Sequence, residues 1–184
     1  MNNAAVKNSL GDLAHIRAGH PFRGAVELVD SGSVAVVQMK DILPNGKIDW
    51  SSVVRTELAG RKEPDWLKPS DLLFVTRGSR YYAVWVDQLP GLAVCGPHLF
   101  HLTVQDSDQV LPEFLAWLVG QGPVQRQLLQ AASGSLQLSV TRQSLEALEI
   151  SLPSIKTQRL IADLASMAAR ERDLLTALIH NREQ

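Results

Sequence analysis

Hydrophobic residues in the first hundred positions form short runs separated by turn residues, a pattern typical of β-strands. The runs lie at residues 33–39, 71–76, 81–86, 92–95 and 98–104. The second and third runs are so close in sequence that they predict a hairpin, with Arg77, Gly78, Ser79 and Arg80 at its tip. No stretch before residue 110 has a helical period of useful length.

Beyond residue 110 the hydrophobic period becomes helical. Pro112 and Pro123 each stand where the first turn of a helix tolerates proline. Thr141 is suited to cap a short helix that ends near Leu148, and residues 149–152 predict a final strand before Pro153. Strands followed by helices predict an α+β domain, which we expect to span residues 8–152.

The C-terminal residues predict one long helix, residues 155–182, which would measure roughly 42 Å at the helical rise. A seam spaced 4-3-4-3-4 runs along it, as in a coiled coil, and comprises Leu160, Leu164, Met167, Glu171, Leu174 and Leu178. Two interpretations are open: the helix packs on its own sheet, or it projects and pairs with another helix. The length and the single seam favour the second, with residues 154–184 as a coiled-coil-forming spacer and dimerisation helix.

Composition changes this picture little. Of the 184 residues, 45% are hydrophobic and 20% charged, which is typical of a globular protein and predicts no membrane span. The first residues lack the apolar run of a secretory signal, so we expect a cytoplasmic protein. The net charge is −1, and residues 83–125 contain no lysine or arginine. Any nucleic-acid surface is therefore expected from the parts of the chain before and after this segment.

Catalytic signatures are missing, because the sequence has no phosphate-binding loop, dinucleotide-binding glycine motif or nucleophile elbow. Cys95 is the only cysteine, which excludes an intrachain disulfide and a cysteine-cage zinc site. Cys95, His98 and His101 have a spacing that metal ligands can adopt, but residues alternate along a strand, so His98 and His101 would point to opposite faces. We therefore expect a non-catalytic protein with no metal site.

Three polar loops are candidates for a recognition surface, because binding residues gather on loops held by a rigid scaffold. At the predicted hairpin tip, two arginines can bind guanine or phosphate and two tyrosines can stack, although a solvated turn explains them equally well. The other loops are the glycine-bracketed segment 19–24 and residues 134–142, which contain no acidic residue. The first-rank candidates for contact with DNA are Arg77, Arg80, Tyr81 and Tyr82, and the second-rank candidates are Arg23, Lys40, Gln137 and Arg142.

Taken in order, the segments resemble the specificity (S) subunit of type I restriction–modification systems, from about Leu10 to Leu178. The segment LGDLAHIRAGHPFRG is similar to the family's opening strand and glycine-rich loop, and LKPSDLLFVTRGS is similar to a central strand followed by glycine. The tail is the most specific part of the resemblance. It comprises Ile150, Leu152, Pro153, Gln158, Ile161, Ala162 and Leu164.

The resemblance implies a non-catalytic subunit that recognises double-stranded DNA and directs an adenine methyltransferase subunit to it. The methyltransferase would use S-adenosylmethionine, whereas this chain would bind no cofactor, and the participation of a nuclease subunit is left open. The alternative is a helix-mediated interaction or regulatory protein of the same family without independent DNA recognition.

A complete S subunit resembles two recognition domains, each followed by a long helix, whereas this chain has one of each and resembles a half-subunit. We therefore expect a homodimer through antiparallel C-terminal helices, in which Glu171 meets Arg170 or Arg172 of the second copy. The rival arrangement pairs the helix with the methyltransferase subunit.

Overall fold

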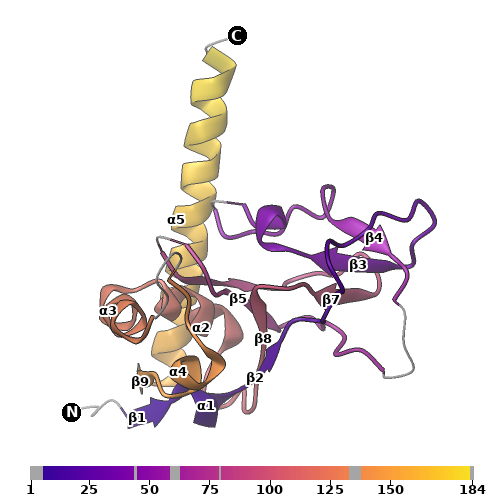
Figure 1. The fold of residues 1–184 in the computed structure, drawn as a ribbon. Helices are drawn as coiled ribbons and strands as arrows, with labels where there is room; N and C mark the ends of the chain where they lie inside the picture. Colours follow the sequence, from indigo (N-terminus) through magenta and orange to yellow (C-terminus); the bar gives the residue numbers. More distant parts are fainter. Residues whose placement is uncertain (1–5, 44, 59–62, 79, 133–137, 183–184) are drawn as a thin grey trace.

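The computed structural model describes residues 6–43, 45–58, 63–78, 80–132 and 138–182, and these form the predicted α+β fold (Figure 1). The strands are β1 (Val6–Ser9), β2 (Ala14–Ala18), β3 (Val34–Val37), β4 (Val54–Thr56), β5 (Leu72–Val75), β6 (Tyr82–Trp85), β7 (Ala93–Cys95), β8 (Leu99–Val104) and β9 (Glu149–Leu152). The helices are α1 (Leu10–Leu13), the 3₁₀ turn η1 (Met39–Asp41), α2 (Pro112–Val119), α3 (Gly122–Ala131), α4 (Arg142–Glu146) and α5 (Ile155–Arg182).

The central sheet has the order β2-β8-β5-β6, and each neighbouring pair is antiparallel. The predicted hairpin is confirmed, since β5 pairs with β6. Successive side chains of β5 enter two different cores: Phe74 packs with the helices on one face, and Leu73 and Val75 pack with the second sheet on the other. Strand β5 is thus buried on both faces, which explains why it is a continuous apolar run.

The second sheet has the order β4-β3-β7, and β3 and β7 run parallel. The runs at residues 92–95 and 98–104 are both strands, but they belong to different sheets. Gly96 allows the chain to cross between them, because a Cβ atom at Gly96 would lie 2.6 Å from the backbone oxygen of Val37. His98, in the left-handed region at φ 66°, then turns the chain into β8.

The helices confirm most of the sequence prediction. Proline stands in the first turn of both α2 and α3, and the Thr141 hydroxyl accepts a hydrogen bond from the backbone N–H of Ser144 at the start of α4. Before residue 110, where the sequence shows no helical period of useful length, two short helices, α1 and η1, form. Helix α1 is a single turn closed by a capping box, in which Ser9 and Asp12 each bind the other's backbone N–H.

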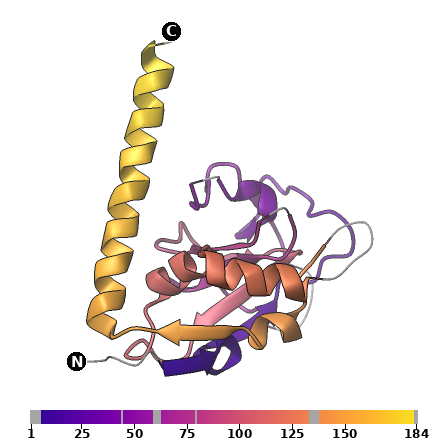
Figure 2. The same ribbon diagram turned by 90° about the vertical axis from the view of Figure 1, so that its left-hand side faces the viewer.

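Helix α5 begins beside the β1–β9 pair, packs its first turns against α2, and extends beyond the rest of the molecule (Figure 2). Its predicted bounds are confirmed. Leu160, Leu164, Met167, Leu174 and Leu178 are 56–67% exposed, so the domain does not bury the seam. Within the described part of the chain, no helix is both long and apolar enough to span a membrane.

Candidate nucleic-acid interface

Three loops that the sequence singles out meet around one hollow of about 340 Å³, which we call the loop groove. The segment after β2, the segment after β5 and the segment before α4 each contribute to it, together with the start of β8. The lining residues are Ala18, Gly19, His20, Pro21, Phe22, Thr76, Arg77, Pro97, His98, Leu99, Phe100, Ser139 and Val140.

The segment after β2 is held against the sheet by its backbone. The N–H of Gly19 donates to the carbonyl of Leu99 at 3.1 Å, and the N–H of His20 donates to the carbonyl of Cys95 at 2.7 Å. A Cβ atom at Gly19 would overlap the backbone oxygen of Gly96, so only glycine permits this approach. This wall of the groove is therefore fixed by the scaffold.

The other two segments are joined by a short stretch of strand-like pairing. Arg77 and Ser139 form an antiparallel bridge, and the N–H of Val140 donates to the carbonyl of Thr76 at 3.1 Å. The Thr76 hydroxyl also donates to the carbonyl of His98 at 2.8 Å, which ties the start of β8 to the same place. Residues more than 60 positions apart in the sequence are thereby held at one place.

The charge of the loop groove favours an anion. Arg77 and two imidazoles, those of His20 and His98, line it, and none of its lining residues is acidic. Within the described residues, the Arg77 guanidinium has no hydrogen-bond or ion-pair acceptor, so its donors remain available to a ligand. A guanidinium fork with neighbouring imidazoles and rings is suited to phosphate oxygens or to the edge of guanine.

The prediction that Tyr81 contacts DNA is corrected by the structure. Tyr81 is fully buried, with its ring stacked on Phe74 at a centroid distance of 6.3 Å. It precedes β6 and points to the helix-facing core, whereas Tyr82 points to the opposite core and is half-buried. The alternation of side chains along the strand therefore separates two residues that we predicted to act together.

The remaining candidates are scattered around the groove rather than gathered in it. Arg80 is exposed and donates to the carbonyl of Gly120 at 3.0 Å, in the turn between α2 and α3. Arg142 pairs with Glu146 at 3.2 Å along α4. Arg23 and Lys40 are exposed but do not line the groove, and Gln137 lies outside the described residues.

Two groove residues, His20 and His98, were missed by reasoning from the sequence. Both stand next to proline, and His20 also follows Gly19, which is a signal for exposed turns. That signal does not reveal that the two turns face each other, since β2 and β8 are far apart in sequence and become neighbours only through sheet pairing.

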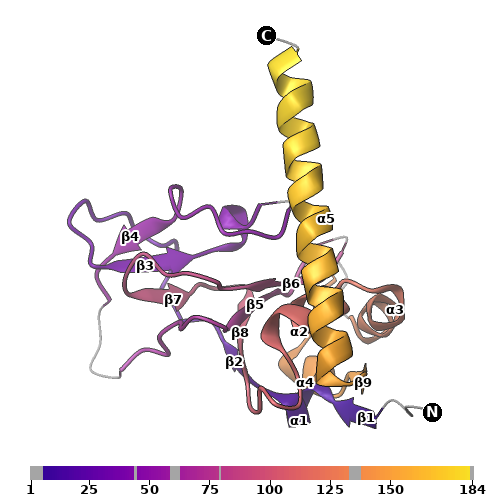
Figure 3. The same cartoon turned by 180° about the vertical axis from the view of Figure 1, so that it is seen from behind.

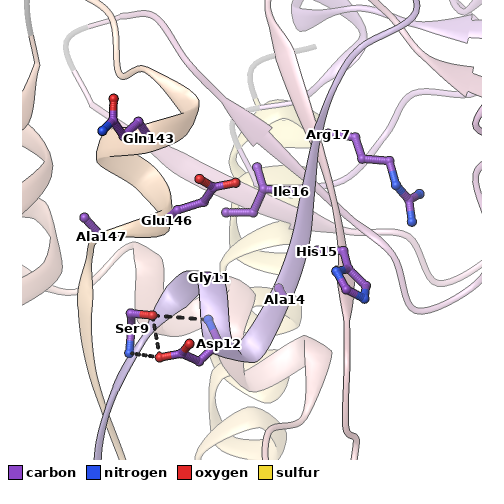
Figure 4. Close-up of a pocket in the computed structure, with 10 residues that line it drawn as sticks. All are labelled: Ser9, Gly11, Asp12, Ala14, His15, Ile16, Arg17, Gln143, Glu146 and Ala147. Atoms are coloured by element: carbon purple, nitrogen blue, oxygen red, sulfur yellow. Dashed lines mark hydrogen bonds between the residues drawn. The ribbon is translucent and has the colours of Figure 1, made fainter.

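A larger hollow of about 670 Å³ lies between α1, β2 and α4, and Figure 4 shows its lining. It contains none of the predicted DNA-contacting residues. Its two carboxylates are engaged, since Asp12 closes the capping box with Ser9 and Glu146 pairs with Arg142. Acidic groups at this hollow disfavour DNA, so the smaller loop groove is the candidate interface.

Cys95, His98 and His101, whose spacing metal ligands can adopt, do not form a common site in the structure. His101 is buried, with Nε2 2.7 Å from an Asp71 carboxylate oxygen, whereas His98 is exposed. Cys95 is buried, and desolvation raises the pKa of its thiol well above the usual value. In the described residues, no three His, Cys, Asp or Glu side chains are grouped as metal ligands.

Comparison with known proteins identifies the family. Residues 4–179 match the sequence model of the type I restriction modification DNA specificity domain. The chain belongs to this family. A search of curated proteins found no match to the specificity domain described here.

Solved structures show the same fold. The S subunit of a type I restriction–modification system from M. genitalium aligns over 100% of this chain with a TM-score of 0.64 and 19% identity. The HsdS subunit from Thermoanaerobacter tengcongensis aligns over 97% with a TM-score of 0.63 and 15% identity. A chain from a structure of the type I restriction–modification system aligns over 100% with a TM-score of 0.70 and 16% identity. The specificity domain spans only 44%, 40% and 43% of these chains, respectively.

Proposed function

We propose that this specificity domain reads a DNA sequence through the loop groove and directs an adenine-methylating subunit to that sequence, without catalysing a reaction itself. The family match over residues 4–179 carries the proposal. The loop groove supports it, because the half-buried Arg77 and two imidazoles line a hollow without acidic residues. The proposed partners are double-stranded DNA and a methyltransferase subunit, with a restriction subunit as a further candidate.

A selection from random DNA duplexes tests sequence recognition directly. Because the chain has a net charge of −1, we expect its overall attraction to DNA phosphates to be weak, so the binding is best measured at low salt. Sequencing of the bound duplexes should reveal one enriched motif. If the bound pool stays as random as the starting pool, both alone and with the methyltransferase subunit present, the proposal fails.

Arg77→Ala is expected to relax the preference at one base pair of that motif. A guanine-reading arginine contributes about 1–3 kcal/mol of discrimination, whereas a phosphate contact weakens all sequences alike. The measurement compares the dissociation constants of the variant for the motif and for its single-base changes. Arg126→Ala, an exposed arginine on α3 outside the loop groove, is the matched control and should keep the full preference. Equal loss on every sequence for Arg77→Ala would assign Arg77 to the DNA backbone.

We further infer that two copies associate through antiparallel α5 helices. The exposed seam supports this, because its 4-3-4-3-4 spacing is the same in both directions along the helix. In an antiparallel pair, Leu160 therefore meets Leu178 of the second copy and Leu164 meets its Leu174. Met167 meets Glu171 of the second copy in two symmetry-related layers, and each Glu171 is close to Arg170 of the opposite helix, which is three residues from its Met167. Polar residues within a seam fix its register.

The proposed dimer predicts the form of the DNA site. Two-fold symmetry places one recognition domain at each end of the helix pair, so each domain reads one half of a split palindrome. If α5 instead pairs with the methyltransferase subunit, the free chain is a monomer and its motif need not be palindromic. The two arrangements thus differ in both oligomeric state and motif symmetry.

A further inference from the structure

Helix α5 is attached to its domain at two separate places, and the first is its base. Gln158 is fully buried there, where its amide group makes three hydrogen bonds of 3.0 Å. Its oxygen accepts from the N–H of Leu111, and its nitrogen donates to the carbonyls of Gln109 and Pro153. This network locks the first turns of α5 to the segment that leads into α2, but it acts at one end of a long helix.

The second attachment lies about 22 Å further along the helix, at Asp173. The Lys47 ammonium group is 2.9 Å from one carboxylate oxygen of Asp173, and the Asn45 amide donates to the same carboxylate at 3.2 Å. Both residues belong to the segment after η1, which reaches the middle of α5 (Figure 3). These hydrogen bonds hold the pKa of Asp173 below the usual carboxyl value, so the carboxylate is ionised at neutral pH.

We propose that Asp173 is a positioning residue: its bonds to Lys47 and Asn45 fix the direction of α5 relative to the recognition domain. Two attachments define the direction of a rod, whereas one leaves it free to pivot. Residues advance by about 100° around a helix, which places Asp173 on the face away from the seam. The contact therefore sets the direction of α5 without occupying the surface that a second helix would need.

The consequence for DNA rests on the proposed function. In an antiparallel dimer, the direction of α5 determines how far apart the two recognition domains lie. A swing of about 10° at the base of a helix roughly 42 Å long moves its far end by about 7 Å, or about two base pairs along a duplex. Asp173 would thus determine which spacing between the half-sites is accepted, without contacting a base.

The direction of the helix can be measured within one chain by double electron–electron resonance. Spin labels at Lys68→Cys on the domain and Asn181→Cys near the end of α5 report it, and Cys95 is too buried to be labelled. Dilution of the labelled protein with excess unlabelled chain restricts the measured distances to those within one chain. The labelled protein in which Asp173, Lys47 and Asn45 are unchanged should give a single narrow distance distribution.

Asp173→Ala and Lys47→Ala should each broaden this distribution at least about twofold, as expected for a helix end that swings by several ångströms. Asp163→Ala, which removes an exposed carboxylate elsewhere on α5, is the matched control and should leave the distribution narrow. The charge exchange Asp173→Lys with Lys47→Asp should narrow it again. An Asp173→Ala distribution as narrow as that of the control would overturn the proposal.

The functional consequence is tested separately, with duplexes whose half-site spacing differs by one base pair. The wild type should lose affinity about tenfold when the spacing changes, as for a mismatched base pair, and Asp173→Ala should lose much less. Affinity for a single half-site should be unchanged in the variant. If no DNA motif exists, the proposed function fails while the distance measurement still decides the role of Asp173. If the distance result holds but both proteins show the same spacing preference, Asp173 orients the helix without selecting DNA.

Discussion

The double variant Leu164→Glu/Leu174→Glu is expected to sediment as a monomer at concentrations where the wild type is a dimer. In the proposed antiparallel pair these two positions face each other, so four carboxylates would enter one apolar seam. The five apolar seam residues are more than half exposed, and burying them at about 25 cal/mol per Å² would favour pairing by several kcal/mol. Losing that burial should raise the dissociation constant at least about a hundredfold.

The matched control is Ser166→Glu/Thr176→Glu, which adds the same charge at exposed positions of α5 outside the seam. It should sediment as the wild type does, and circular dichroism should show equal helix content in both variants. A wild type that remains monomeric at tens of micromolar contradicts the homodimer. In that event, co-sedimentation with a methyltransferase subunit tests the rival pairing.

His101→Ala is expected to destabilise the domain by about 3–5 kcal/mol, since it leaves a buried carboxylate without its main partner. In the structure the Asp71 carboxylate accepts hydrogen bonds from the Thr103 hydroxyl at 2.9 Å and the Lys68 N–H at 2.7 Å, besides the contact to His101. These groups join β5 to β8 in the central sheet. Urea unfolding measures the change, and His15→Ala, an exposed histidine on neighbouring β2, should change stability by less than about 0.5 kcal/mol.

The same pair predicts a dependence of stability on pH. Burial opposes ionisation of Asp71. The hydrogen bond and charge of His101, together with the hydrogen bonds from Lys68 and Thr103, outweigh it, so the pKa of Asp71 lies below its usual value. A carboxyl group with a lowered pKa stabilises the fold above its unfolded pKa, and this contribution is lost as the pH falls below about 4. Asp71→Asn should therefore lose less stability than the wild type over that acidic range. An equally steep loss in both proteins would show that other carboxylates dominate acid unfolding.

The elements that the sequence predicted correctly are those with a local cause. Each of these elements is specified by residues inside it or next to it. The examples are the apolar runs of the strands, the prolines in the first turns of α2 and α3, the Thr141 cap of α4 and the regularly spaced seam of α5. Helix α1 was missed because a single turn is too short to show a period, although its Ser9 and Asp12 capping pair is visible in the sequence. Short helices are thus better detected from their caps than from their periodicity.

The candidate site was only partly predictable, because it depends on pairing between distant segments. Three loops were singled out by their composition, and they do meet at one groove. Which residues of each loop face the groove depends on strand register, as the burial of Tyr81 beside a half-exposed Tyr82 demonstrates. Likewise, no local pattern indicates that Lys47 and Asp173 lie 2.9 Å apart, since 126 positions separate them.

The central claim, that this specificity domain determines which DNA sequence is methylated, is tested most directly by mapping methylated adenines. The domain and a methyltransferase subunit of a type I system are expressed together in cells, and the genome is sequenced with base-modification detection. The account predicts methylation at one split, palindromic sequence, which disappears when the specificity domain is omitted. A methylation pattern that is unchanged by the omission would contradict it.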